Sequence, residues 1–228
     1  MTPMMATSSV STFAGSPSAP LVLGLAGPAG CGKSTAAALL AARGGWRRLS
    51  FADPLRELLL ALHPAWDLWH LGPGKDLSPA DGGPSPRELM RAVGDWAKRY
   101  DQGFFVRIAH QALQRAQRQG LAVVIDDVRY EPEATLIRSL GGRIVHLSRP
   151  EVRFRRDHTS ELGIDPAPED LHLRNWGGLS ALSAELEQVL GLAGLAMLSP
   201  CPMGGMPPPV TSPRHRSEEH TSELQSQR

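Results

Sequence analysis

The sequence predicts an α/β fold of three layers, in which a central parallel sheet is flanked by helices on both faces. Strand-like apolar runs alternate with helix-like segments along the chain, as expected for repeated strand–helix units. The runs 21–26 and 121–125 are apolar throughout, which is typical of parallel strands buried on both faces. A Gly-rich turn, Gly27–Ser34, joins the first run to a segment rich in Ala and Leu. Together these features favour an open parallel sheet with a ligand site beside its first strand.

Composition limits the classes of protein to consider. The chain has 228 residues, 41% of them hydrophobic, which is enough for one α/β domain with its own core and a small inserted lid. A formal net charge of +1 gives no overall field to recruit nucleic acid or an acidic membrane. The two cysteines, Cys31 and Cys201, form neither a disulfide framework nor a zinc site, which fits a reducing cytosol. The apolar run 21–26 is too short for a signal peptide or a membrane span.

The first ordered unit is expected after a leader. Residues 1–19 consist of small and polar residues without charge, and we expect them to be disordered. The run 21–26 is the first strand, and a helix follows from about residue 33 to residue 43, where Gly44 and Gly45 end it. Residues 46–51 are expected to form the second strand.

The turn between this strand and this helix reads G-x-x-x-x-G-K-S, a complete phosphate-binding loop (P-loop) in its required setting. Its glycines let successive backbone N–H groups face one polyanion, and the following helix adds its N-terminal partial charge. Lys33 would reach the β- and γ-phosphates, and the Ser34 hydroxyl can bind Mg²⁺. The residues expected to hold the nucleotide here are Gly27, Ala29, Gly30, Cys31, Gly32, Lys33, Ser34 and Thr35.

Two interpretations remain open for Asp53. The segment Phe51–Arg56 turns into a helix, with Asp53 placed as its N-cap and Pro54 at the first helical position. The same carboxylate would also lie near the end of a parallel strand, where ligands bind in open α/β sheets. One residue could serve in both roles.

The middle of the chain predicts a loop and two helices. Residues 63–84 are rich in Pro and Gly and are expected to be irregular. Ser85, Pro86 and Glu88 then form the pattern of a capped helix start. The apolar stripe of that helix contains Leu89, Met90, Val93 and Trp96, while Arg87, Arg91 and Arg99 lie off it. Residues 104–119 predict a further helix, ended by Gly120.

Two consecutive carboxylates, Asp126 and Asp127, follow the buried run 121–125. A turn is one interpretation. The other, favoured by the P-loop, is that an acidic residue at this strand end holds Mg²⁺ together with the P-loop serine. Arg129 lies within reach of the same edge.

The last third of the fold ends with a basic segment, a strand and a helix. A helix over 132–140 and a strand over 143–148 precede the segment 149–158. Arg149, Arg153 and Arg156 share one helical face, which is either a solvated surface or a lid over the transferring phosphoryl, at about 149–170. The final elements expected are a strand at 171–175 and a helix at 179–192.

The residues after this helix predict no core. Residues 193–228 are rich in Pro, Gly and Ser and are expected to be a disordered tail. Within it, residues 216–228 are similar to the in-frame translation of a sequencing-library adapter, and we expect them to carry no biological information.

Taken in order, these residues resemble the phage-type deoxynucleoside monophosphate kinases, a family of P-loop nucleotide kinases, over about residues 20–192. The resemblance rests on Gly27–Ser34, Phe51–Leu55, the segment from Arg87 to Trp96, Asp126–Tyr130 with Glu133 and Ala134, and His158–Glu161. In this chain Tyr130 stands where Phe is more usual. Asn175-Trp176-Gly177 is similar to an Asn-Asp-Gly element, with Trp in the middle.

The resemblance implies a P-loop NTPase fold with a small Arg-bearing lid, and transfer of the γ-phosphoryl of ATP to a (deoxy)nucleoside monophosphate. Because the acceptor is already an oxyanion, the site needs cations and a metal rather than a general base. Implied catalytic residues are Lys33, Asp53, Arg153 and Arg156, with Ser34 and Asp126 for Mg²⁺ and Arg149 on the ATP side. Implied acceptor residues are Asp53, Arg56, Arg87, Arg91, Trp96, Asp127 and Arg129.

Trp96 or Phe104 could stack on the acceptor base, although aromatic residues at helical spacing are more often part of a core. We expect a cytoplasmic protein, in the host cytoplasm if phage-encoded, that is a monomer or homodimer. The near-neutral charge and the lack of a basic tract with interleaved aromatic residues disfavour binding to nucleic acid, and we expect no binding to membrane. Two alternatives stay open. One is a kinase with a hydroxyl acceptor, similar to dephospho-coenzyme A kinase, with Asp53 as base. The other is a non-kinase P-loop ATPase or switch, which would need a residue to position water.

Overall fold

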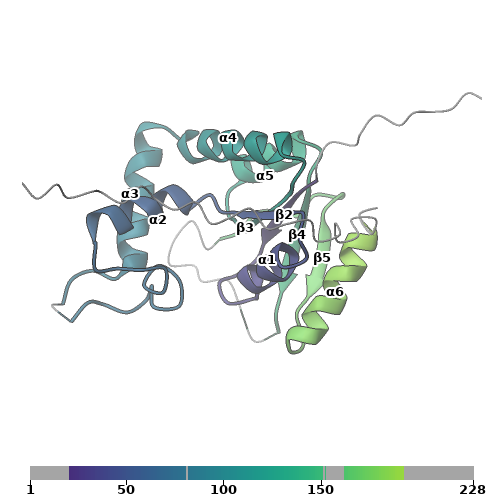
Figure 1. The fold of residues 1–228 in the computed structure, drawn as a ribbon, viewed down its shortest axis with the longest axis horizontal. Coiled ribbons are helices and arrows are strands. Elements are labelled where there is room, and N and C mark those ends of the chain that lie inside the picture. Colours follow the sequence, from purple (N-terminus) through teal and green to yellow (C-terminus); the bar gives the residue numbers. More distant parts are fainter. Residues whose placement is uncertain (1–20, 81, 151, 153–161, 193–228) are drawn as a thin grey trace, which may run out of the picture.

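A computed structural model of the chain describes residues 21–80, 82–150, 152 and 162–192 (Figure 1). The expected leader and tail lie outside the described residues. So do residues 151 and 153–161 of the expected lid, including Arg153 and Arg156.

A single sheet of five parallel strands forms the centre of the described chain, in the order β2-β3-β1-β4-β5 (Figure 1). The strands are β1 (Val22–Ala26), β2 (Trp46–Leu49), β3 (Ala122–Val128), β4 (Arg143–Ser148) and β5 (Leu171–Arg174). Because β1 is the middle strand, the P-loop at its carboxyl end lies at the centre of the edge where open α/β sheets bind ligands. The parallel sheet predicted from the sequence is confirmed.

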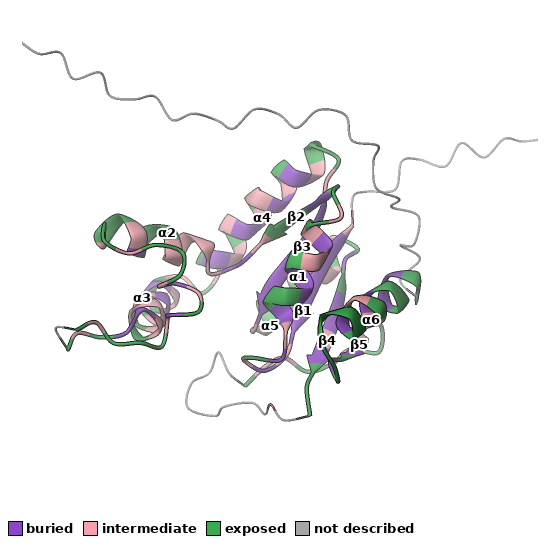
Figure 2. Ribbon diagram, turned by 60° about the horizontal axis from the view of Figure 1, so that its bottom comes forward, coloured by how far each residue is buried: buried purple, intermediate pink, exposed green. Residues whose placement is uncertain are grey.

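The described residues form six helices beside the sheet, and four of them cover its two faces. They are α1 (Lys33–Ala41), α2 (Asp53–Leu62), α3 (Pro86–Tyr100), α4 (Phe104–Arg118), α5 (Glu131–Ser139) and α6 (Leu179–Leu192). One core packs Leu40 of α1 and Leu186 of α6 against the sheet, and the other packs Leu113 of α4 and Ile137 of α5 against the opposite face. Figure 2 shows the buried strands between these helices. None of the described helices is long and apolar enough to cross a membrane.

The remaining two helices, α2 and α3, pack on one another beyond the sheet, at the left of Figure 1. A Cβ built on Gly94 of α3 would lie 3.4 Å from Leu55 Cδ1 of α2, so the absence of a side chain at Gly94 allows a close approach. The described residues of the long connection between the two helices form turns but no strand or helix, as the Pro and Gly content of this segment predicted.

Two local predictions are wrong, and so is the less favoured interpretation of Asp126 and Asp127 as a turn. Asp126 and Asp127 belong to β3, which continues to Val128, so they do not form a turn. Asp53 is the first residue of α2 and Ala52 is its N-cap, because the Asp53 carboxylate accepts the Ser50 N–H instead of an N–H of its own helix. Trp96 was placed on a core stripe but is 62% exposed.

The predicted cap of α3 is confirmed. Ser85 Oγ accepts the N–H of Glu88, and the Glu88 carboxylate accepts the N–H of Ser85 at 2.8 Å. Pro86 is the first helical residue. This cap determines where α3 begins, and therefore the placement of the arginines in its first two turns.

Replacing this cap tests its contribution to stability. We expect Ser85→Ala to lower the free energy of unfolding by about 1 kcal/mol, because one N–H at the start of the helix loses its acceptor. Urea denaturation followed by circular dichroism measures the change. Ser85→Thr retains the hydroxyl and serves as the control, and equal losses in both variants would contradict a capping role.

Candidate active site

The P-loop lies between β1 and α1, and its shape depends on glycine. Gly27, Gly30 and Gly32 have φ values of 136°, 84° and 108°, a region that other residues rarely adopt. A Cβ on Gly27 would also lie 2.3 Å from the backbone oxygen of Leu147 on β4. The loop is therefore held close to the neighbouring strand and ends at the N-terminus of α1, whose first N–H groups have no partner within the helix.

The Lys33 side chain folds back onto the P-loop that precedes it. Its ammonium donates to the backbone oxygens of Gly27 and Pro28 at 2.7 and 2.8 Å, and the side chain is buried. Ser34 and Thr35, which follow in the first turn of α1, are exposed. A cation, backbone N–H groups and an exposed hydroxyl thus meet at one helix N-terminus, the combination that binds a nucleotide polyphosphate.

Asp126 lies on β3, the strand next to β1, and is 3% exposed. One carboxylate oxygen, Oδ2, accepts a hydrogen bond from the Arg48 guanidinium, whereas Oδ1 is buried without a hydrogen-bond partner among the described residues. Burial raises the pKa of Asp126, the Asp127 charge raises it further, and Arg48 opposes both. A buried carboxylate oxygen without a partner fits a hard cation such as Mg²⁺.

Sequence reasoning missed Arg48. The available signal was its position in the predicted second strand, where it shares a face with the buried Trp46. The pairing of β2 with β3 sets Arg48 beside Val124, and thus near Asp126.

Asp127 has a different task from Asp126. Its carboxylate accepts the N–H groups of Phe51 and Ala52 at 2.8 and 3.0 Å, and also the Ser50 hydroxyl. These bonds tie the turn after β2 to β3. Asp127 therefore positions α2 while it also lines the adjoining pocket.

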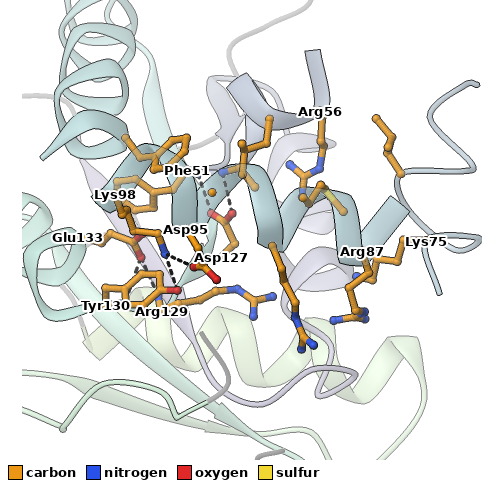
Figure 3. Close-up of a pocket in the computed structure, with 17 residues that line it drawn as sticks. Phe51, Arg56, Lys75, Arg87, Asp95, Lys98, Asp127, Arg129, Tyr130 and Glu133 are labelled. Carbon is orange, nitrogen blue, oxygen red and sulfur yellow. Dashed lines mark hydrogen bonds and ion pairs between the residues drawn. The ribbon is translucent and has the colours of Figure 1, made fainter. Parts of the chain in front are cut away.

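That pocket lies between the sheet edge and the α2–α3 pair (Figure 3). Its apolar wall includes Phe51, Leu55, Leu71, Met90 and Phe105. Its cationic residues are Arg56, Lys75, Arg87, Arg91, Lys98 and Arg129. In Figure 3, Arg56, Lys75 and Arg87 lie on one side, and Lys98, Tyr130 and Glu133 on the other. An apolar wall with an arginine cluster suits a ligand that joins a flat base to a phosphate.

Positive charge is crowded on the arginine side of the pocket. Burial lowers the pKa of Lys75, and the charges of Arg87 and Arg129 lower it further. Carboxylates compensate part of this charge, since Arg87 pairs with Asp76 and Arg56 pairs with Asp53 at 2.7 Å. A bound phosphate would complete the compensation.

The opposite side of the pocket contains a buried carboxyl group. Glu133 is 6% exposed and accepts the N–H groups of Arg129 and Tyr130 at 2.8 and 3.1 Å. Burial and then the Asp127 charge raise its pKa to about 8. Nearby, Lys98 donates to the Tyr130 hydroxyl at 2.7 Å and lies 3.7 Å from Asp95.

The structure brings together some of the predicted acceptor residues and separates others. Arg56, Arg87, Arg91, Arg129 and Asp127 all line the pocket. Trp96 and Phe104 do not, and they are 62% and 40% exposed. Phe105 lines it instead of Phe104, since a shift of one residue turns a helical side chain to another face. Arg149 is exposed just after β4, at the same sheet edge as the P-loop.

A P-loop and a second, basic pocket on one parallel sheet define a P-loop kinase. The sequence model of the deoxynucleotide monophosphate kinase family matches residues 83–186. A protein of Acanthamoeba polyphaga mimivirus, provisionally named a deoxynucleotide monophosphate kinase, is 31% identical over 156 residues, which cover 62% of this chain and 81% of that protein. The chain belongs to the deoxynucleotide monophosphate kinase family.

More distant similarities were also found. The deoxynucleotide monophosphate kinase of Enterobacteria phage T4 is 26% identical over 109 residues, 46% of this chain and 45% of that protein. Among solved structures, Mycobacterium tuberculosis APS kinase is 19% identical with a TM-score of 0.41, covering 77% of this chain and 99% of that one. TT1252 from Thermus thermophilus is 22% identical with a TM-score of 0.40, and the match covers 76% of this chain and 97% of that one.

The raised pKa of Glu133 predicts how stability depends on pH. Between its ordinary value of 4.5 and about 8, the folded protein retains a proton that the unfolded chain has lost. Glu133 therefore lowers stability as pH rises through this window, by about 1.4 kcal/mol per pH unit at most. We expect Glu133→Gln to flatten the decline in urea midpoint between pH 5 and pH 8. Glu57→Gln, at an exposed position, is the control. If the urea midpoint of Glu133→Gln declined with pH as steeply as that of the wild type, Glu133 would not retain its proton in the folded protein.

Proposed function

We propose that this chain transfers the γ-phosphoryl group of ATP to a deoxynucleoside monophosphate, giving ADP and the deoxynucleoside diphosphate. The observation that carries the proposal is that the P-loop and the basic pocket lie at the same edge of the sheet. Asp126 is on β3, beside the strand that leads into the P-loop, and its neighbour Asp127 lines the basic pocket. Two phosphate-binding sites at these positions would adjoin at consecutive residues of β3, as direct transfer between two bound nucleotides requires.

The chemistry demanded of the protein is mainly positioning and charge neutralisation. The acceptor phosphate oxygen is already an anion, so no proton has to be removed before it attacks. Lys33 and the N–H groups of the P-loop would bind the donor phosphates, and Lys33 would exchange its bonds to Gly27 and Pro28 for phosphate oxygens. Arg56, Arg87, Arg91 and Arg129 would hold the acceptor phosphate, because a planar guanidinium binds two phosphate oxygens at once.

Ser34 and Asp126 are the residues that would hold Mg²⁺, directly or through water. When bound, the ion neutralises charge on the β- and γ-phosphates. Arg149, Arg153 and Arg156 are proposed as lid residues over the transferring group, and the last two lie outside the described residues.

A hydroxyl acceptor with Asp53 as base is not favoured. One Asp53 oxygen accepts the Ser50 N–H at 2.8 Å and the other pairs with Arg56 at 2.7 Å, so both are engaged. Burial raises the pKa of Asp53, the Arg56 charge opposes this, and the residue does not line the pocket. These contacts suit a residue that orients Arg56.

The proposal is tested by incubating the protein with ATP, Mg²⁺ and each common nucleoside or deoxynucleoside monophosphate, and measuring ADP. We expect ADP with at least one deoxynucleoside monophosphate, and a decrease of about 100-fold or more in rate for Lys33→Met, since the cation that neutralises the transferring group is lost. Arg115→Met removes an exposed cation on α4 and is the control. Near wild-type turnover in Lys33→Met, or ADP at the background level with every monophosphate, would refute the mechanism.

The acceptor role of α3 is tested by a pair of arginine variants. Arg91 lines the pocket, whereas Arg99 is exposed on the same helix away from it. Arg91→Ala should raise the KM for the monophosphate about tenfold or more and leave the KM for ATP unchanged, because one charge-assisted phosphate contact is lost. Arg99→Ala should change neither. Equal increases of both KM values in Arg91→Ala would contradict an acceptor role.

A further inference from the structure

The turn after β5 contains a buried polar residue that the proposed mechanism does not use. Asn175 follows Arg174, the last residue of β5, and is 6% exposed. Its backbone N–H donates to the Ser148 backbone oxygen at 2.8 Å, which fixes it to the end of β4. Its side-chain amide, Nδ2, donates to the backbone oxygen of Cys31 at 3.0 Å. Cys31 is in the middle of the P-loop, 144 residues earlier in the chain.

The Cys31–Gly32 peptide lies in the Gly-rich part of the P-loop, where an external partner can fix its orientation. Gly30 precedes Cys31 and Gly32 follows it, and both glycines have positive φ and no Cβ to restrict rotation about their own bonds. In a trans peptide the C=O and the N–H point in opposite directions. A partner that holds the Cys31 oxygen therefore also holds the Gly32 N–H, pointing away from Asn175.

The Asn175 side chain also packs directly against Gly32. A Cβ built on Gly32 would lie 2.6 Å from Asn175 Nδ2. Gly32 is the N-cap of α1, so its N–H belongs to the group of donors that a phosphate meets at this helix end. The Asn175 side chain thus holds the loop from the side opposite the Gly32 N–H, and that N–H stays accessible to a ligand.

We infer that Asn175 is a positioning residue for donor-nucleotide binding, which holds the Cys31–Gly32 peptide in the orientation that presents the Gly32 N–H to phosphate. The inference rests on the proposed role of the P-loop as the donor site. Asn175 touches no substrate in this assignment. Its effect passes through the P-loop backbone, so it should alter affinity for ATP and ADP but not for the monophosphate.

Binding of Mg²⁺-ADP to the full chain, measured by isothermal titration calorimetry, provides the first test. We expect Asn175→Ala to weaken ADP binding about tenfold, since the Cys31 oxygen loses its donor. Asn175→Asp keeps the size of the side chain but sets a carboxylate against that oxygen, and should weaken binding more than alanine does. The KM for ATP should rise in parallel, with the KM for the monophosphate unchanged.

Asp170→Asn is the matched control. Asp170 is a buried residue directly before β5, at the opposite end of the strand from Asn175, where it accepts the Ala167 N–H and pairs with Arg138. Its replacement should lower the melting temperature without weakening ADP binding. If Asn175→Ala lowered only the melting temperature and bound ADP like the wild type, Asn175 would be merely structural and the inference would fall.

A second measurement needs no variant, because Asn175 is the only asparagine in the chain. Labelling with ¹⁵N-asparagine therefore gives one backbone amide signal and one pair of side-chain amide signals in an NMR spectrum. We expect Mg²⁺-ADP to shift the side-chain pair and the monophosphate alone to leave it in place. If the chemical shifts of the Asn175 side-chain amide did not change when ADP binds, the inference would be overturned, even if Asn175→Ala failed to fold.

The outcomes also separate this inference from the proposed function. If the wild-type protein bound no ADP, both the donor role of the P-loop and the inference about Asn175 would be refuted. Normal ADP binding in Asn175→Ala would refute the inference about Asn175 and leave the proposed function unaffected. ADP binding that depends on Asn175, in a protein that phosphorylates no monophosphate, would support the inference and refute the acceptor half of the proposed function.

Discussion

One additional residue in β3 is the constraint on which both proposed sites depend. Gly24 of β1 pairs with Ile125, but Ala26 pairs with Val128, so β3 has one residue more than β1 over this interval. Such bulges re-aim side chains and often lie beside functional sites. Here the bulge contains Asp126 and Asp127. The first reaches Arg48 and retains an open oxygen, while the second holds the turn that leads into α2.

The basic pocket shows how a fold tolerates a cluster of cations before any ligand binds. Arg87 and Arg56 are paired with Asp76 and Asp53. These partners reduce the repulsion between like charges while the guanidinium groups stay at the pocket wall. A pocket arranged in advance in this way loses little conformational entropy when a phosphate enters.

The P-loop is held from outside as much as by its own sequence. Its glycines permit the required turns, but they do not select one of them. The selection comes from β4, whose Leu147 oxygen lies close to Gly27, and from the turn after β5, whose Asn175 amide binds the Cys31 oxygen. Strand β4 and the turn after the edge strand β5 thus determine the shape of a loop whose motif is local in the sequence.

The sequence by itself determined the features that depend on neighbours along the chain. These are the P-loop, the capping box at Ser85, the ends of most helices, and the buried strands with their parallel arrangement. Only the tertiary structure decided the rest: Asp127 as an anchor for the Ser50 turn 77 residues away, the Arg48 contact with Asp126, and Asn175 against the P-loop. Each of these needs the register between strands, and a shift of one residue turns a side chain to another face. On the helices, where each residue turns to a different face, the packing decided that Phe105 enters the pocket while Trp96 faces solvent.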